Sequence, residues 1–556
     1  MVTPVRIAVI GVGPRGLSAV ERIVSHSRLD GPPVELVLVE PAELGAGIHH
    51  PEQPDYLLLN TICSQLTIFS DRAMAPGAPV TEGPSLYEWC RQRSRSVGFD
   101  DYLPRRLLGE YLRWAARRIL NEPPARLTVK RRCAVAEDVR PAAGGATVTF
   151  GANAPGLTVD LAIVTTGHGL PGAAEAGDGT RIASPYPLPE RVAGLAPGTT
   201  VALLGTGLTA MDVIASLTVG RDGTFAPDRR GLRYLPSGRE PRIVLANRSG
   251  CLPCARPAVS EDRRPAPARF LTVAGVAALR RPGRARLDFR RDVEPLIHRE
   301  AMSRMPGAPA AQQAAVARAL SPVQDRWTDD ATYRSAVLTR AREDLREAEA
   351  GLGVSAVKEG LEVLRDHRET LRTAIDAPGL TAESHRYFMT EYVSVVNRAV
   401  CGPQKERVHE ILALIDAGVV ALAPGPAPTL ARTQHGWLLV STRLGEPAEQ
   451  AVDVVVRANV TWPATISDHD PVPAALRCWC EPGPGALPSL GLDRDGYVLG
   501  ADRPTVAVFG PPAEGTSYYN HYVPTPGVWS RALTDLDRVI APVLSGDNRV
   551  PEETAP

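Results

Sequence analysis

The fold of this chain is decided by VRIAVIGVGPRGLSAVERIV, residues 5–24. Its first part, residues 5–10, is an apolar and β-branched run that is typical of a buried strand. After a short polar break, Leu17, Val20 and Ile23 recur at helical spacing. The stretch therefore predicts a strand that passes through a tight turn directly into a helix.

Three glycines occupy the break between this strand and helix. Gly11 allows the tight turn, Gly13 lets a pyrophosphate approach the backbone, and Gly16 lets the helix pack closely on the strand. The free N–H groups and the dipole at the start of the helix favour a phosphate. The next expected strand, VELVLVE, ends at Glu40, where a carboxylate can bind both hydroxyls of an adenosine ribose. The pattern predicts a dinucleotide-binding unit, against the alternative of a glycine-rich turn without a ligand.

A second unit of the same kind begins at TTVALLGTGLTAMDVIASL, residues 199–217. Gly205 and Gly207 belong to a G-x-G-x-x-A turn after an expected strand. The following strand, RIVLANRSG, ends in Arg248 and Ser249 rather than in an acid. A guanidinium with a neighbouring hydroxyl can bind a ribose 2′-phosphate, which an acid would repel. The alternative is that Arg248 is a solvated charge at a strand end.

Two units with different strand ends indicate two different dinucleotides. The first unit, whose second strand ends in Glu40, is expected to bind FAD. The second unit, whose corresponding strand ends in Arg248, is expected to bind NADPH. Hydride would then pass from the nicotinamide to the flavin, while the protein supplies orientation and electrostatics.

Composition limits the partners that this chain can have. Lys and Arg number 62 and Asp and Glu also 62, so the formal net charge is zero and offers no general attraction to nucleic acid or to an anionic membrane. We find no apolar run near the roughly 18 residues that a membrane helix needs, and no signal-peptide pattern before the first strand. We expect a soluble cytoplasmic protein, and whether it forms a homo-oligomer stays open.

Cys251 and Cys254 form a C-x-x-C pair, which is typical of a redox dithiol or of half a zinc site. Cys478 and Cys480 have the wrong spacing to complete a zinc site, and the histidines show no ligand spacing. We expect neither a metal site nor an active disulfide, although a disulfide reductase with two nucleotide units stays open.

Arginines are concentrated in RRPGRARLDFRRD, residues 280–292. With one interleaved aromatic residue and a neutral chain, this cluster indicates a solvated or ion-paired face rather than a nucleic-acid site. A second interpretation is that one or two of these arginines, or Arg304, bind an acidic substrate.

Longer stretches carry a resemblance to a known family. They are GAGIHHPEQPDYLLLNTICSQLTIFSD (45–71), LPRRLLGEYL (103–112) and TVAVFGPPAEGTSYYNHYVPTPGVWSRAL (505–533). Together with the two turns, they resemble the FAD-NAD(P)-binding family of two-dinucleotide flavoproteins. That family is similar in turn to class B flavin-dependent N-hydroxylating monooxygenases.

The resemblance implies roles for individual positions around the flavin. Asn60 would lie near the isoalloxazine, Arg105 would lie near the FAD, and Gly510 and Gly515 would close over the flavin. The residues implied to bind FAD are Gly11, Gly13, Gly16, Glu40, Asn60, Arg105, Gly510 and Gly515.

The resemblance also implies an NADPH site and a substrate pocket. The NADPH site would consist of Gly205, Gly207, Thr209, Arg248 and Ser249. The candidate catalytic residues are Asn60, Asn520 and His521, although the loop SYYNHYVPTP that holds the last two can equally be a capped loop of the flavin unit.

The expected fold class is α/β, with two Rossmann-like dinucleotide-binding domains and a largely helical insertion. Residues 1–182 and 470–556 would form the FAD-binding domain, and residues 183–262 and 395–469 the NADPH-binding domain. Residues 263–394 would form the helical insertion, a substrate domain.

The resemblance implies a FAD- and NADPH-dependent monooxygenase of secondary metabolism. A neutral amine would attack a flavin C4a-hydroperoxide formed with O2, so that the amino group of a small amino acid or amine is N-hydroxylated. L-aspartate, oxidised toward a nitroso product, is one concrete candidate. The alternatives are an NADPH-linked flavin reductase or dehydrogenase without oxygen insertion, and a redox-sensing nucleotide binder without turnover.

Overall fold

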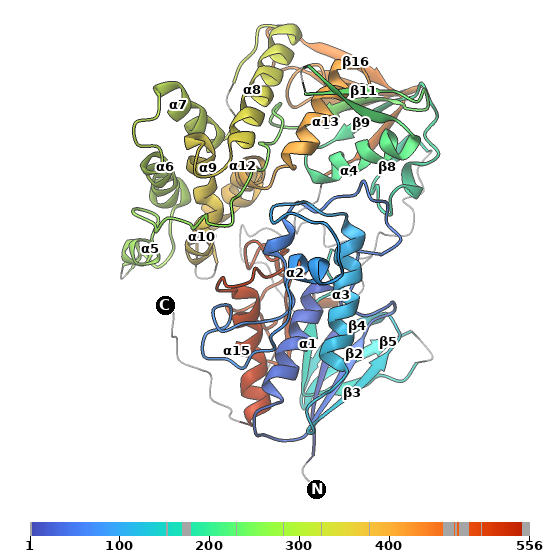
Figure 1. The fold of residues 1–556 in the computed structure, drawn as a ribbon. Coiled ribbons are helices and arrows are strands. Elements are labelled where there is room, and N and C mark those ends of the chain that lie inside the picture. The colour runs from blue at the N-terminus through green and yellow to red at the C-terminus, as the bar shows by residue number, and fades with distance from the viewer. Residues whose placement is uncertain are drawn as a thin grey trace.

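The computed structural model shows two α/β units and a helical region (Figure 1). The residues that it describes are 3–151, 154–168, 179–229, 231–281, 283–323, 325–376, 379–459, 472, 475–476, 489–501 and 503–546.

The first unit is built on a five-stranded parallel sheet with the strand order β18-β7-β1-β2-β3. Strand β1 lies at the centre, and the edge strand β18 comes from the far end of the chain. The strands are β1 (Val5–Ile10), β2 (Val34–Val39), β3 (Leu127–Arg132), β7 (Leu161–Val164) and β18 (Val506–Val508).

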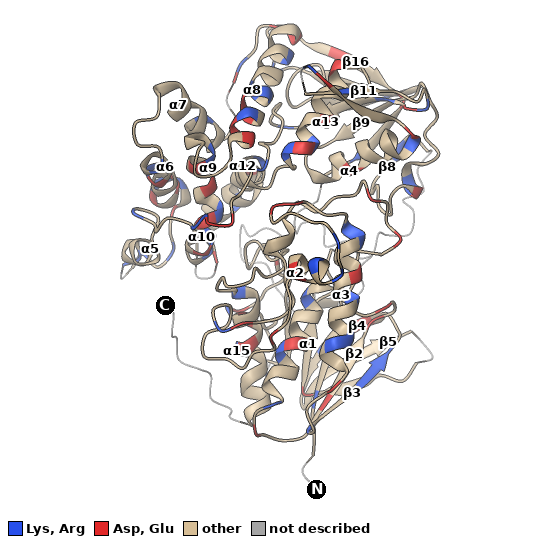
Figure 2. Ribbon diagram, viewed as in Figure 1, with Lys and Arg blue, Asp and Glu red and all other residues tan. Residues whose placement is uncertain are grey.

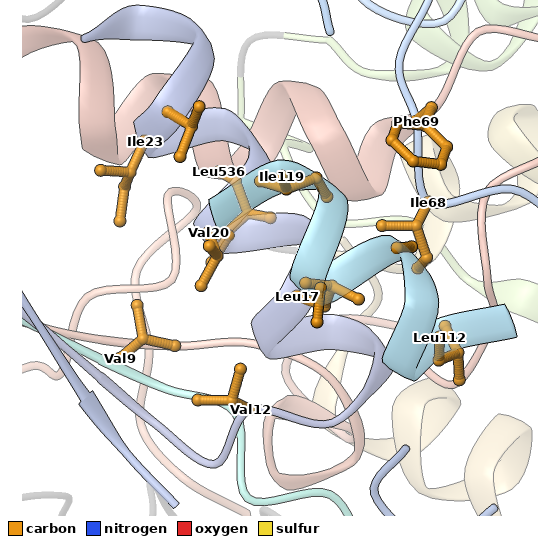
Figure 3. Packing of buried hydrophobic residues seen from close by; sticks show 14 of the residues in the cluster. Val9, Val12, Leu17, Val20, Ile23, Ile68, Phe69, Leu112, Ile119 and Leu536 are labelled. Carbon is orange, nitrogen blue, oxygen red and sulfur yellow. The ribbon is translucent and has the colours of Figure 1, made fainter. Parts of the chain in front are cut away.

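Both faces of this sheet are covered, which explains why β1 is apolar at successive positions. Val9 points into a core with Val20, Ile119 and Leu536, which come from three different helices (Figure 3). Ile10 joins the core on the other face, under a three-stranded antiparallel sheet. The covering elements are α1 (Pro14–His26), α2 (Leu86–Gln92), α3 (Arg105–Leu120), α15 (Arg531–Ser545), β4 (Ala136–Ala142), β5 (Gly145–Phe150) and β6 (Leu157–Val159).

The second unit repeats the design with the strand order β13-β12-β9-β17-β8, again all parallel. Strand β8 pairs with β17, so this sheet includes two residues that precede the expected boundary at 183. Its elements are β8 (Arg181–Ile182), β9 (Thr200–Leu204), α4 (Leu208–Leu217), β12 (Arg242–Ala246), α13 (Lys405–Asp416), β13 (Val420–Leu422) and β17 (Val454–Arg457). Smaller sheets are formed by β10 (Thr224–Asp228) with β11 (Gly231–Leu235), and by β14 (Thr429–Thr433), β15 (Gly436–Ser441) and β16 (Ala448–Val452).

The region between the two halves of the second unit is helical and has its own core. Leu361, Leu364, Leu371 and Ile375, expected on one helical face, are all buried in that core. The helices are α5 (Val273–Leu279), α6 (Glu294–Ser303), α7 (Ala310–Ala319), α8 (Asp330–Ala350), α9 (Ala356–Asp366), α10 (Arg368–Ile375), α11 (Ala382–Tyr387) and α12 (Val393–Val400). The expected fold class, two Rossmann-like units with a helical insertion, is confirmed.

Charges of both signs are distributed over all parts of the fold (Figure 2), in agreement with the zero net charge of the chain. None of the helices among the described residues is both long enough and apolar enough to cross a membrane.

Candidate functional site

The first glycine-rich turn leaves no room for side chains at two of its glycines. Gly11 has φ +84°, and a Cβ atom there would lie 2.8 Å from the carbonyl oxygen of Thr165 in the neighbouring strand connection. A Cβ atom at Gly16 would lie 2.1 Å from the carbonyl oxygen of Gly11. Helix α1 therefore starts directly against the end of β1, which leaves its free N–H groups at the carboxyl edge of the sheet.

Glu40 lies beside this turn at the end of β2. Its carboxylate accepts hydrogen bonds from the backbone N–H of Val12 (2.9 Å) and of Ala42 (3.1 Å). A Cβ atom at Gly13 would lie 3.3 Å from the Cα atom of Gly47, so the segment after β2 covers the turn. The close backbone, the helix start and the fixed carboxylate fit the ADP half of FAD.

The second turn has the same form but is more open. Gly205 has φ +134°, and a Cβ atom there would lie 2.4 Å from the carbonyl oxygen of Ala458. A Cβ atom at Gly207 would meet no protein atom within 4 Å. Thr209 lies buried in the first turn of α4. The open face at Gly207 is where a pyrophosphate could approach this backbone.

The loop after β12 is held by Asn247. Its side-chain amide donates to the hydroxyl of Thr206 in the second turn (2.5 Å), and its side-chain oxygen accepts from the hydroxyl of Ser249 (3.2 Å). Ser249 is thus engaged within the loop, whereas Arg248 is exposed and has no ion-pair partner among the described residues. The strand register places this loop next to the second turn, since Ala246 pairs with Leu204.

Arg105, expected near the FAD, joins the two dinucleotide-binding units. Its guanidinium forms an ion pair with Asp212 of α4 (2.6 Å), and the hydroxyl of Tyr186 donates to the same carboxylate (2.5 Å). Its Nε atom donates to the carbonyl of Leu58 (3.1 Å), in the segment before Asn60.

Asn60 is half-buried, and its side-chain amide has no hydrogen-bond partner within the described parts of the chain. The backbone before it is fixed, because the N–H of Leu59 donates to the carbonyl of Leu103 (2.9 Å) and its carbonyl accepts from Gln404. This part of the chain therefore presents the amide of Asn60 from a rigid backbone.

Gly510 and Gly515 flank a short turn after β18. Both adopt positive φ angles, +81° and +98°. The carbonyl of Gly515 accepts a hydrogen bond from Nε2 of His385 in α11 (2.7 Å). The end of the first sheet is thereby tied to the helical region.

The loop with Asn520 and His521 is organised by a buried acid, Glu514. This carboxylate accepts from the backbone N–H of Tyr519 (2.5 Å) and of Asn520 (2.8 Å), and lies 3.4 Å from Nδ1 of His521. Tyr519 is held at φ +59°, a region that is uncommon for a residue with a side chain. The structure therefore brings two of the candidate catalytic residues together around one carboxylate.

Two arginines attach this loop to the rest of the molecule. Arg15, in the first turn of α1, donates to the carbonyl of Asn520 (2.9 Å). Arg372 of α10 donates to the carbonyls of Tyr518 (3.1 Å) and Tyr519 (2.6 Å). The loop thus lies between the first glycine-rich turn and the helical region.

The cysteine pair is not joined by a disulfide in the structure. Cys251 and Cys254 are both free thiols. Burial raises the pKa of the Cys251 thiol, and it raises that of Cys254 to about 12. The reactive thiolate is therefore disfavoured at both positions. Cys478 and Cys480 lie outside the described residues.

Several of the arginines considered for an acidic substrate have partners within the fold. Arg304 contacts Glu300 (2.9 Å) and the carbonyl of Ala266 (2.8 Å). In the 280–292 cluster, Arg284 and Arg291 pair with Asp292. An ion-paired face, the first interpretation, describes these arginines.

The sequence analysis missed Asp212 and Glu514, although both lie inside motifs that it quoted. The local sequence around such a carboxylate does not indicate which residue will be its ion-pair or hydrogen-bond partner. Asp212 is matched with Arg105 only by the packing of two separate units, and Glu514 turns its carboxylate onto the loop that follows it.

Comparison with known proteins agrees with this geometry. A model of the FAD-NAD(P)-binding family matches residues 8–169. The chain is 31% identical to the L-aspartate N-monooxygenase (nitrosuccinate-forming) of Streptomyces cremeus, over 97% of this chain and 94% of that protein. It is 28% identical to the nitrosuccinic acid synthase of Aspergillus oryzae, over 99% of this chain and 95% of that protein.

A solved structure with similar coverage is the ornithine N-hydroxylase of Kutzneria sp. 744, at 13% identity and a TM-score of 0.48, over 97% of this chain and 99% of that chain. The family model covers the first turn, and the Streptomyces cremeus relative matches nearly the whole chain. This chain therefore belongs to the FAD-NAD(P)-binding family, as one of its flavin-dependent monooxygenases.

Proposed function

We propose that this protein uses FAD, NADPH and O2 to oxidise the amino group of L-aspartate toward a nitroso product. The observation that carries the proposal is similarity along nearly the whole chain to the L-aspartate N-monooxygenase of Streptomyces cremeus, at 31% identity. Because the match also covers the helical region, it includes the part of the chain expected to form the substrate site.

The two turns support the division of cofactors between the units. The first turn, with Glu40 beside it, would hold FAD, and the second, with Arg248 beside it, would hold NADPH. Bound FAD, once reduced by NADPH, supplies the activation of O2. The domain boundaries at residues 262, 394 and 469 are proposed with this division, and the first boundary, expected at residue 182, is moved before β8 because β8 belongs to the second sheet.

Asn60, Asn520 and His521 are assigned to the substrate side of the flavin. The amine must be neutral to act as a nucleophile, so an ammonium substrate has to lose a proton first. The imidazole of His521, whose Nδ1 lies 3.4 Å from Glu514, is the group that would take this proton. Asn60 and Asn520 would orient the amine from fixed backbone on either side.

The first N-hydroxylation converts an amine, O2, NADPH and a proton into a hydroxylamine, water and NADP⁺. Further rounds of the same chemistry would lead to the nitroso level. Eight cysteines in 556 residues are far below the density of a disulfide framework, which supports a location in the cytoplasm.

The experiment follows NADPH oxidation and products in parallel over a panel of amino acids and amines. L-aspartate is expected to stimulate NADPH consumption and to give N-oxidised products by mass spectrometry. Stimulation by another amine alone would overturn the substrate. Peroxide formation without an N-oxidised product from any amine would favour the flavin reductase.

A further inference from the structure

Two arginines at the inner end of the helical region carry charge that the fold does not fully neutralise. Arg365 of α9 lies 3.9 Å from Glu362, but both oxygens of that carboxylate accept hydrogen bonds from Arg256, each at 2.9 Å. The guanidinium of Arg365 also donates a hydrogen bond, from Nη2 to the side-chain oxygen of Gln65 (2.6 Å).

Arg368, the first residue of α10, has no carboxylate partner within the described chain. Its guanidinium lies over the rings of Tyr519 (4.7 Å) and Tyr522 (5.5 Å), and its Nε atom is buried without a hydrogen-bond partner. A buried donor without an acceptor destabilises the fold, so this position favours an anion. It differs in this respect from Arg304 and Arg372, whose guanidiniums are both bonded to protein oxygens.

Both arginines line the same cavity, together with Tyr519 and Cys401. Val396 and Val400 of α12 form part of its apolar wall. The cavity is small, about 10 Å³, which is close to the volume that one water molecule needs, so the end of a ligand enters it only if the lining side chains move apart. A single carboxylate is a terminal group that two guanidiniums can bind with charge-assisted hydrogen bonds.

The cavity adjoins the segments that are proposed to surround the flavin. Tyr519 belongs to the loop that Arg15 ties to the first glycine-rich turn, through the carbonyl of Asn520. Gln65, which contacts Arg365, follows Asn60 in the same segment. A ligand with its carboxylate in the cavity would contact both the helical region and these segments of the first unit.

We propose that Arg365 and Arg368 form the subsite for a carboxylate of the substrate. This rests on the proposed oxidation of L-aspartate, and it explains how an acidic amino acid is selected by a chain with zero net charge. Arg368 is the residue that would distinguish the acid from its amide, because it has no carboxylate partner among the described residues. Arg365 would orient the same carboxylate while bonded to Gln65.

The test replaces Arg368 by Met, which keeps the length of the stem and removes the charge, and by Lys, which keeps the charge. The matched control is Arg299→Met, an exposed arginine of the helical region that lies over the ring of Phe270 (4.2 Å). Circular dichroism shows whether each variant folds, and the Lys variant keeps the test valid if the Met variant does not.

Arg368→Met is expected to raise the KM for L-aspartate about 10- to 100-fold with an unchanged KM for NADPH. Arg368→Lys should recover part of that loss, and Arg299→Met should behave as the wild type. L-asparagine and L-isoasparagine each have an amide in place of one carboxylate of L-aspartate. If Arg368 binds the carboxylate that one of these amides lacks, the KM for that amide should be the same in the wild type and in Arg368→Met. That comparison identifies which carboxylate is bound. Equal KM values for L-aspartate in the wild type and Arg368→Met would overturn the subsite.

A binding measurement separates this inference from the proposed function. Succinate carries two carboxylates and no amine, and calorimetry should show that the wild type binds it at least ten-fold more tightly than Arg368→Met. If the enzyme shows this difference but does not oxidise L-aspartate, the result supports the carboxylate subsite and contradicts L-aspartate as the substrate. Oxidation of L-aspartate with equal succinate affinity in both proteins contradicts the subsite alone.

Discussion

A Cβ atom would meet different surroundings at different glycines of the two turns, so the reason for glycine differs between these positions. At Gly16 a Cβ atom would lie 2.1 Å from a backbone carbonyl oxygen, so the protein itself excludes it. At Gly207 the backbone has φ −81°, which any residue adopts, and the space around a Cβ atom is open. The fold itself therefore does not require glycine at this position, and we expect that the approach of a ligand does.

We therefore expect Gly16→Ala and Gly207→Ala to fail in different measurements. Gly16→Ala should lower the free energy of unfolding by about 1–3 kcal/mol or more, because a backbone must move. Gly207→Ala should leave that energy within about 0.5 kcal/mol and raise the KM for NADPH. Chemical unfolding without nucleotides, together with NADPH titrations, measures both. An unstable Gly207→Ala protein would contradict this account.

Arg248 is the residue from which the preference for NADPH was inferred. It is exposed at the end of β12 and has no ion-pair partner among the described residues, so its guanidinium is available to a 2′-phosphate. Arg248→Ala should raise the KM for NADPH about 10- to 100-fold and leave that for NADH nearly unchanged. Arg242→Ala, at the opposite end of the same strand, is the control in steady-state assays. Equal effects on both nucleotides would show that Arg248 does not bind the 2′-phosphate.

At the scale of elements, one buried ion pair attaches α9 to the loop after β12. Glu362 accepts two hydrogen bonds from Arg256, and both side chains are nearly inaccessible to solvent. Burial by itself would raise the pKa of Glu362, but the adjacent guanidinium outweighs this and holds the pKa at about 2. The carboxylate therefore stays ionised through the neutral and mildly acidic range.

This pair gives a pH dependence with a definite sign. The pKa of Glu362 is lower in the folded chain than its ordinary value of 4.5, so its contribution is present above pH 4.5 and is lost as the pH falls toward about 2. Glu362→Gln should cost about 3–5 kcal/mol near neutral pH, because Arg256 stays buried without a counter-charge. The difference from the wild type should shrink in acid.

Urea unfolding at a neutral and at an acidic pH measures this change. Glu406→Gln is the control, because Glu406 is exposed and an ion pair with an exposed carboxylate, here with Lys405, contributes about 0–1 kcal/mol. A difference for Glu362→Gln that stays constant with pH would contradict the ionised pair.

At the scale of the whole molecule, the two dinucleotide-binding units meet through Arg105 and Asp212. The pair is 2.6 Å apart and largely buried, and the hydroxyl of Tyr186 shares the carboxylate. Hydride transfer needs the nicotinamide and the flavin in one geometry, and this contact fixes one unit against the other.

Asp212→Asn is expected to destabilise the protein by about 3–5 kcal/mol, because it leaves Arg105 buried and without a counter-charge. It should also slow flavin reduction by NADPH in stopped-flow experiments, with little change in NADPH affinity. Asp222→Asn is the matched control, since Asp222 and its partner Arg239 are both exposed. Normal reduction by a destabilised Asp212→Asn protein would show that the pair serves folding alone.

The sequence by itself determined the two nucleotide-binding turns, the residues at their strand ends and the helical character of the insertion. These features depend on residues that are close along the chain, where backbone geometry and periodicity act directly. Tertiary structure alone decided that Arg105 joins Asp212 and that Arg15 holds a loop 505 residues away. It also decided which arginines of the described residues form ion pairs. A charge finds its partner through the packing of separate units, and local sequence carries no record of that packing.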